Sequence, residues 1–422
     1  MDALRLANTA LAVDIFKKLC EKSATDNFVC SPLCISSSLS LIRKGSQGNT
    51  ASELEKVSLC MAYILRWTGP RKNPVGPGCS DPIPPGRSTD LLVSLPRRAA
   101  LHFEKVKDPD FGFQLLSSDI SKISSANSLK LLKRVYVDNS IECKKDFINS
   151  AKKPYPLELE TIDFKSQAEE ARTQINSSVK ELTDGNFETV LNEGSCDENT
   201  KIIMLGAASF KGKWVYTFNK SETKEMDFHI NKKETKPVQM MHLEARLSIG
   251  YINELKTMVL EMPFQSKHFS MLILLPKDIE DDSTGLKKLE QDMTFEKYTH
   301  WTNPSMMANS KVKVSLPKFK MENSYDLKDM LKSLGINDAF NEEASDFSEM
   351  TESKGISISQ AIQKACIEVD EDGTESADVS MERRLMNKEE FLADHPFIYI
   401  LRHNKTRTII MLGRYCGPSE AS

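Results

Sequence analysis

The chain has 422 residues, of which 40% are apolar and 27% charged, a balance typical of a globular protein rather than a disordered one. Its 56 basic and 60 acidic residues give a net charge of −4, so no overall positive field attracts nucleic acid or an anionic membrane. No apolar run reaches the roughly 18 residues of a membrane-spanning helix. The first residues also lack the basic and then apolar order of a signal peptide.

The first fifth of the chain predicts helices. Apolar residues recur every three or four positions over residues 4–19, which indicates a helix with one buried face. A second helix is predicted from Ser31-Pro32, a cap residue followed by proline in the first turn, to a stop at Gly45. The run Thr50 to Glu53 has the spacing of a capping box and predicts the start of a third helix that continues through Leu54.

Residues 59–100 interrupt this pattern. They contain seven of the chain's 18 prolines, so we expect a solvated, disordered insertion rather than a structural element. Two P-x-x-P patterns, at Pro74 and Pro82, are weak evidence for a peptide ligand in so proline-rich a segment. The extra residues begin at Val57-Ser58, a dipeptide that a splice donor would encode if translated. Transcript sequencing distinguishes a genuine insertion from a retained intron.

Strand patterns dominate after residue 101. Strands are predicted at 131–137, 257–264, 270–276, 312–316, 397–402 and 408–413. The second and third of these flank a short polar link and predict a hairpin. Apolar residues between 327 and 334 predict a short helix that ends at Gly335. Helices early in the chain and strands in its last half predict an α+β fold in a single domain of residues 1–422.

The motifs of common enzymes and metal sites do not occur in the sequence. It has no nucleophile elbow, no H-E-x-x-H pair and no phosphate- or dinucleotide-binding glycine loop. Its nine cysteines form no dense framework and include an odd one, which predicts a reduced, intracellular setting. Cys30 and Cys34 are four residues apart and would share a helix face, but no second pair completes a zinc site. We therefore expect no enzyme, no metal and no cofactor.

Five short runs, spread over both ends of the chain and its middle, occur together in one known family. They are Ser31-Pro32-Leu33, the stretch Phe210 to Trp214, Val238 to Met241, the acidic hinge Glu368 to Glu375, and Phe391 to Leu401. With these runs in order the chain resembles the serpin family, and its start without a signal peptide resembles the intracellular, ovalbumin-like branch. The resemblance implies the serpin fold, an α+β architecture of about nine helices around three β-sheets with an exposed reactive loop.

The resemblance also implies where the working parts lie. In an inhibitory serpin a protease cuts the reactive loop, which then inserts as a new central strand of the large sheet and drags the acyl-enzyme along. Here that loop is expected at residues 373–390, with Arg383 and Arg384 as candidates for the scissile position. The hinge that would lead the insertion comprises Glu371, Gly373, Thr374, Glu375, Ser376 and Asp378.

Two features of this loop argue against insertion. An inserted strand alternates faces, and in the family pattern the side chains that turn into the core are those of Thr374, Ser376, Asp378, Ser380 and Glu382. Asp378 and Glu382 would bring unpaired carboxylates into an apolar face, at a cost of several kcal/mol at least. The loop is also a couple of residues shorter than in inhibitory members. We therefore predict that the loop is a substrate rather than a trap.

The sheet-opening machinery of the family is also altered. Serpins usually place an asparagine before the Ala207-Ala208 strand and a histidine in the strand that leads to the hinge, whereas Gly206 and Gln363 occupy these positions here. The usual hydrogen bond between the two side chains therefore cannot form, although Gln363 keeps a donor and an acceptor. Gly206 should also weaken its strand locally. Trp214 is retained, and we expect it to pack at the top of the sheet.

From this resemblance we expect a non-inhibitory serpin that acts by binding partners in cell adhesion, migration and growth control. The expected partners are proteins, either a trypsin-like protease that cleaves the loop or adhesion and matrix proteins, and not nucleic acid. The chain is expected to be a monomer in the cytoplasm, and also outside the cell by a route without a signal peptide. Two alternatives stay open: an inhibitor of a trypsin-like protease that uses the loop arginine, and a storage or structural serpin with no dedicated partner.

Overall fold

The computed structural model describes residues 2–55, 118–120, 128–152, 158–265, 267–376 and 389–418. The expected insertion at 59–100 lies outside the described residues, and so do Asp378, Arg383 and Arg384 of the expected reactive loop. The expectations that concern them therefore stay predictions.

Helices dominate the first part of the described chain and strands the last half. The helices are α1 (Asp2–Lys22), α2 (Pro32–Lys44), α3 (Gly48–Glu55), α6 (Lys145–Lys152), α7 (Phe164–Leu182), α8 (Lys287–Asp292), α9 (Phe295–Trp301) and α10 (Lys328–Ser333). The strands are β1 (Phe28–Cys30), β2 (Ser128–Asp138), β3 (Glu158–Ile162), β4 (Ile202–Lys211), β5 (Trp214–Thr217), β6 (Lys224–His229), β7 (Thr235–Ile252), β8 (Thr257–Pro263), β9 (Phe269–Pro276), β10 (Met307–Pro317), β11 (Phe319–Asp326), β12 (Ile358–Val369), β13 (Gly373–Ser376), β14 (Glu389–Leu392), β15 (Phe397–His403) and β16 (Thr408–Tyr415). The predicted α+β class is confirmed.

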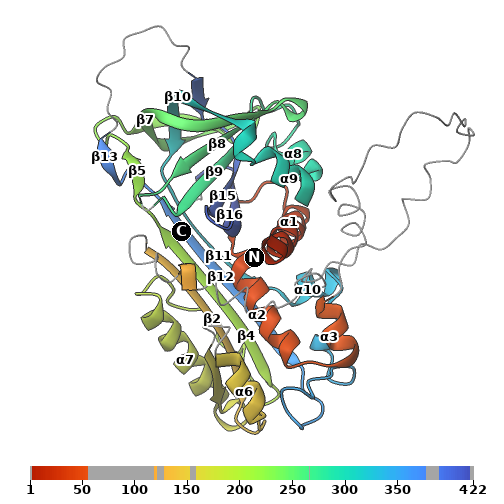
Figure 1. Cartoon of the computed structure of the whole chain (residues 1–422). Coiled ribbons are helices and arrows are strands. Elements are labelled where there is room, and N and C mark those ends of the chain that lie inside the picture. Colours follow the sequence, from red (N-terminus) through yellow and green to blue (C-terminus); the bar gives the residue numbers. More distant parts are fainter. Residues whose placement is uncertain are drawn as a thin grey trace, which may run out of the picture.

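The described strands form three sheets. A nine-stranded sheet has the order β1-β16-β15-β9-β8-β7-β10-β14, with β6 paired to β7. A five-stranded sheet, called the central sheet below, has the order β11-β12-β4-β2-β3, and β5 pairs with β13 separately. Figure 1 shows the long strands of the central sheet running diagonally below the nine-stranded sheet. The first described strand pairs with the last, because β1 lies antiparallel to β16 with Phe28 opposite Arg414.

The central sheet is covered on both faces. Neighbouring residues of a strand point to opposite faces, so Ile203 and Leu205 of β4 pack in one cluster with Phe164 and Val179 of α7. Met204 points the other way and belongs to the cluster that contains the buried face of α2. Figure 1 shows α7 and α2 on opposite sides of these strands. All residues of β4 except the last are buried, so a strand added beside β4 would enter the interior.

Elements with clear local signals match their predictions. Helix α2 begins after Ser31, whose hydroxyl accepts a hydrogen bond from the Cys34 N–H (3.4 Å), and it ends at Gly45. The predicted hairpin is β8 and β9, with Thr257 opposite Pro276. The two predicted C-terminal strands are β15 and β16, which pair antiparallel.

The predicted capping box at the start of the third helix is wrong. Helix α3 begins at Gly48, so Thr50 lies inside the helix, where its hydroxyl accepts a hydrogen bond from the Asp346 N–H (2.9 Å). The Glu53 carboxylate accepts from the backbone N–H groups of residues 337 and 338 instead of capping its own helix. Polar spacing that suits a helix start here serves contacts with a distant segment.

Candidate functional site

The hinge of the expected reactive loop, taken from here on as residues 370–376, leaves the central sheet. After β12 the chain turns through residues 370–372 and enters β13, which pairs in parallel with β5 rather than with β4 or β12. Figure 1 shows β13 beside β5, beyond the end of the long strands. Strands β4 and β12 stay paired with each other from Ile358 opposite Ile202 to Glu368 opposite Lys211. The position that an inserted strand would take is therefore closed.

Backbone carbonyl groups of the hinge are bound by β5 and the residue that follows it. The indole Nε1 of Trp214 donates to the Asp370 carbonyl oxygen (2.9 Å), and the Trp214 backbone N–H donates to the Asp372 carbonyl oxygen (2.9 Å). Between these two, the Phe218 N–H donates to the Glu371 carbonyl oxygen (3.2 Å). Trp214 is buried, as expected, and its hydrogen bonds hold the hinge in place.

Close packing requires glycine at position 373. A Cβ atom there would lie 2.7 Å from both the Cα and the backbone N of Thr217, closer than such atoms can approach. Residues Thr374 to Ser376 continue the pairing with β5. The predicted hinge positions from 373 to 376 thus form β13 itself, which lies against β5.

Three consecutive acidic residues of the hinge contact lysines from three other segments. The pairs are Asp370 with Lys211, Glu371 with Lys318 and Asp372 with Lys220, each with an N–O distance of 2.9 Å. Burial opposes ionisation of Glu371, but hydrogen bonds from Lys318 and Thr223 outweigh it and hold the pKa of its carboxyl below the usual value. The Lys220 bond likewise lowers the pKa of Asp372. The Glu371 and Asp372 carboxylates therefore stabilise the hinge fully at pH values above the ordinary carboxyl pKa. This stabilisation decreases as the pH falls through their lowered pKa values.

Sequence reasoning missed the three lysines. Lys211 belongs to the run Phe210 to Trp214 that carries part of the family resemblance, yet nothing beside it in the sequence points to an acidic partner. Its contact with Glu368 joins residues 157 positions apart. A pairing at that separation leaves no periodicity in the sequence, so only the folded structure identifies it.

A second altered position lies in the middle of the central sheet. Gln363 on β12 sits opposite Gly206 on β4, and Gly206 sits opposite Lys133 on β2. The row formed by these three residues faces α2, because a Cβ atom on Gly206 would lie 3.2 Å from the Cys34 Cβ. Gln363 is fully buried, and its Nε2 donates to the Lys364 carbonyl oxygen (3.2 Å). No donor among the described residues reaches its Oε1, so the cross-strand hydrogen bond is missing, as expected.

Replacing Gln363 with methionine is expected to stabilise the protein by about 1 kcal/mol, because it removes a buried oxygen that lacks a donor. Methionine keeps the length of the side chain, and the hydrogen bond that it loses is a long one. Urea unfolding measures the change. Gln360→Met is the matched control on the same strand, since Gln360 Nε2 donates to the Ser195 carbonyl oxygen and its loss should destabilise. A Gln363→Met variant less stable than the parent contradicts this interpretation.

The predicted cysteine pair and the possibility of a metal site can be compared with the described residues. No group of three or more His, Cys, Asp or Glu side chains among them is arranged to hold a metal ion, and no helix among them is long and apolar enough to cross a bilayer. Cys30 ends β1, so the predicted helix face shared with Cys34 is wrong, because the helix starts only after Ser31. Burial raises the pKa of both thiols and so keeps them protonated and unreactive.

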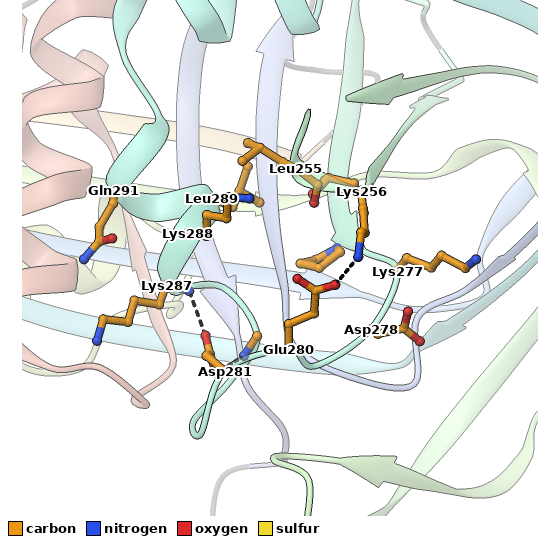
Figure 2. Close-up of a pocket in the computed structure, with 13 residues that line it drawn as sticks. Leu255, Lys256, Lys277, Asp278, Glu280, Asp281, Lys287, Lys288, Leu289 and Gln291 are labelled. Carbon is orange, nitrogen blue, oxygen red and sulfur yellow. Dashed lines mark hydrogen bonds and ion pairs between the residues drawn. The ribbon is translucent and has the colours of Figure 1, made fainter. Parts of the chain in front are cut away.

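A surface pocket of about 260 Å³ lies beside α8, and none of its lining residues belongs to the hinge (Figure 2). Lys256 pairs with Glu280, and the Asp281 carboxylate accepts a hydrogen bond from the Lys287 backbone N–H (3.2 Å). Figure 2 shows the Lys277 side chain pointing away from these groups. The ion pair neutralises the charges of Lys256 and Glu280 within the pocket.

The fold and the hinge agree with the family that the comparisons identify. The family model described as Serpin (serine protease inhibitor) matches residues 6–73 and 88–418, and the chain belongs to the serpin family. The predicted serpin fold is therefore confirmed. The stretch 74–87 that the model leaves unmatched falls within the segment 59–100.

Within this family the chain is similar to maspin, or Serpin B5. A Serpin B5 of Xenopus tropicalis is 90% identical over 422 residues, with 100% of both sequences covered. A crystal structure of maspin is 47% identical, with a TM-score of 0.85 and 99% of each chain covered. A solved structure described as that of a tumour suppressing serpin is also 47% identical, with a TM-score of 0.83, and the match covers 99% of this chain and 100% of that one.

Proposed function

We propose that this serpin is neither a protease inhibitor nor an enzyme, and that it acts by binding partner proteins in cell adhesion, migration and growth control. The observation that carries the proposal is the hinge, in which β13 pairs with β5 outside a closed β4–β12 pair. A hinge bound in this way resists the step on which a protease trap depends. The similarity to a tumour suppressing serpin supports the link to growth control.

The loop composition supports the same proposal. In the family pattern Asp378 and Glu382 would turn inward on insertion, and β4 is buried at every residue but the last. An unpaired carboxylate in that interior costs several kcal/mol. Insertion would then be slower than hydrolysis of the acyl-enzyme, so the protease would leave and the loop, residues 373–390, would remain cut. In this proposal the chain is one domain, 1–422, with 59–100 as an insertion.

The proposed partners are proteins. A trypsin-like protease would cleave at Arg383 or Arg384, while adhesion or matrix proteins would bind the intact surface. The chain would act as a monomer, in the cytoplasm and also outside the cell by a route without a signal peptide. The second candidate function is inhibition of a trypsin-like protease through the loop arginine, and the description of the matching family model as serine protease inhibitor favours it.

A short incubation with trypsin tests the proposed function, read on a denaturing gel and followed by a heat scan. We expect a cut near Arg383, no covalent complex and no gain in melting temperature. The control is the Arg383→Ala, Arg384→Ala double variant, which should lose the cuts after residues 383 and 384, while a cut after Lys388, the third basic residue of the loop, is distinguished by fragment mass. A complex that survives denaturation, or a melting temperature that rises after the cut because the loop has added a strand, would overturn the proposal and favour the inhibitor.

A further inference from the structure

Lys211 connects the two strands that would have to separate for the loop to insert. It is the last residue of β4 and lies opposite Glu368 of β12. Its ammonium contacts the Glu368 carboxylate and, at 2.9 Å, the carboxylate of Asp370 at the start of the hinge. The hydrogen bonds to Glu368 and Asp370 raise the pKa of Lys211, so the side chain keeps its charge. One side chain thus joins β4, the end of β12 and the hinge.

Separation of the two strands would break these contacts. Neighbouring strands lie about 4.8 Å apart, so a strand added between β4 and β12 would move their backbones to about 10 Å apart. It would also place an inserted residue between Lys211 and Glu368. The contact with Asp370 would be lost as well, because the hinge would have to turn back alongside β12. The closed sheet is the arrangement in which Lys211 reaches both carboxylates.

The other hinge lysines occupy different positions. Lys220 contacts Asp372 from the segment after β5, so it joins the hinge to its outer neighbour and does not link β4 to β12. Lys318 lies between β10 and β11 and contacts Glu371. Among these three lysines, Lys211 alone lies on one of the two strands that border the insertion position.

We propose that Lys211, Glu368 and Asp370 form a latch that keeps β4 and β12 together at the end where insertion would begin. The latch determines how readily the hinge opens in the uncleaved protein. Its exposure makes it sensitive to salt, because the Lys211 and Glu368 side chains are 44% and 33% exposed and screening weakens contacts that solvent reaches. The inference rests on the proposed function only in treating the closed sheet as the working state.

Hydrogen exchange in the full-length, uncleaved protein tests the latch. In Lys211→Met we expect the amides of residues 366–369 to exchange about tenfold faster than in the parent at low salt, because two partly exposed ion pairs are lost. Lys211→Arg should stay near the parent rate, because arginine keeps the positive charge that both ion pairs require. Lys220→Met is the matched control: it loses a hinge ion pair without touching the β4–β12 contact, so the same amides should keep the parent rate.

Salt gives a second measurement that needs no substitution. Raising sodium chloride from 0.1 M to 1 M shortens the screening length from about 10 Å to about 3 Å. The rate in the parent protein should rise towards that of Lys211→Met, whose own rate should stay the same. Equal rates in the two proteins at low salt, or faster exchange spread evenly over β2 and β12, would overturn the latch. The test forms no protease complex, so its failure is distinguishable from a failure of the trypsin experiment.

Discussion

Replacing Trp214 with alanine is expected to lower the free energy of unfolding by about 3–5 kcal/mol, the range for a large aromatic side chain removed from a core. Trp214 is 1% exposed, and its ring stacks on Phe264 with ring centroids 4.3 Å apart. The change also takes the indole donor away from the Asp370 carbonyl oxygen. Urea unfolding measures the stability, and hydrogen exchange at β13 measures the hinge, which should loosen more than the rest of the molecule.

Two further variants separate the contributions of Trp214. Trp214→Phe keeps an aromatic ring and removes the indole N–H, a hydrogen bond worth about 1 kcal/mol. Trp301→Ala removes a tryptophan of similar burial, 4% exposed, which contacts Glu254 instead of the hinge. This control should destabilise the protein without a selective change at β13. Equal exchange at β13 in the two alanine variants would show that Trp214 does not position the hinge.

Replacing Arg414 with methionine is expected to cost about 3–5 kcal/mol, the range for breaking a buried ion pair by removing one partner. Arg414 is fully buried, and its Nη1 donates to the Glu290 carboxylate (2.7 Å). Its Nη2 donates to the carbonyl oxygens of Ser23 and Asp26, both at 2.8 Å. The variant would leave a mostly buried carboxylate without its positive partner and two carbonyl groups without this donor. Urea unfolding measures the loss.

A double variant isolates the ion pair from the packing. Arg414→Met with Glu290→Met removes both charges, so much of the lost stability should return, because no unpaired carboxylate remains in the interior. Arg172 and Glu169 of α7, whose side chains are 19% and 49% exposed, give the opposite reference, a partly exposed pair whose loss should cost far less. If Arg414→Met were no more destabilising than Arg172→Met, the buried pair would not carry the stability expected of it.

Elements that are fixed by their own residues could be predicted from the sequence. Helix α2 was predictable because Ser31 caps it and Gly45 ends it, both through local hydrogen bonds. The β8–β9 hairpin was predictable because its strands are neighbours in the chain. Helix α3 was misread at its start because the hydroxyl of Thr50 and the carboxylate of Glu53 bind backbone groups almost 300 residues away.

The hinge could be predicted only in part. The family resemblance identified Gly373 and the acidic residues before it, and it identified Gly206 and Gln363 as departures from the usual pattern. It did not identify β5 as the strand that binds the hinge or Lys211 as a side chain that joins β4 to β12. These contacts depend on which distant segments the fold brings together, and a single sequence carries no local signal of that.

The pairing of β1 with β16 sets an order of events during synthesis. The Arg414 side chain donates to the carbonyl oxygen of Asp26, 388 residues earlier in the chain, and α1 and α2 both pack against β16. A nascent chain therefore carries these first elements without their neighbour until β16 leaves the ribosome. Contacts of such separation slow folding, and strands that wait unpaired promote aggregation. Synthesis of β16 therefore sets the earliest time at which α1, α2 and β1 can reach their native contacts.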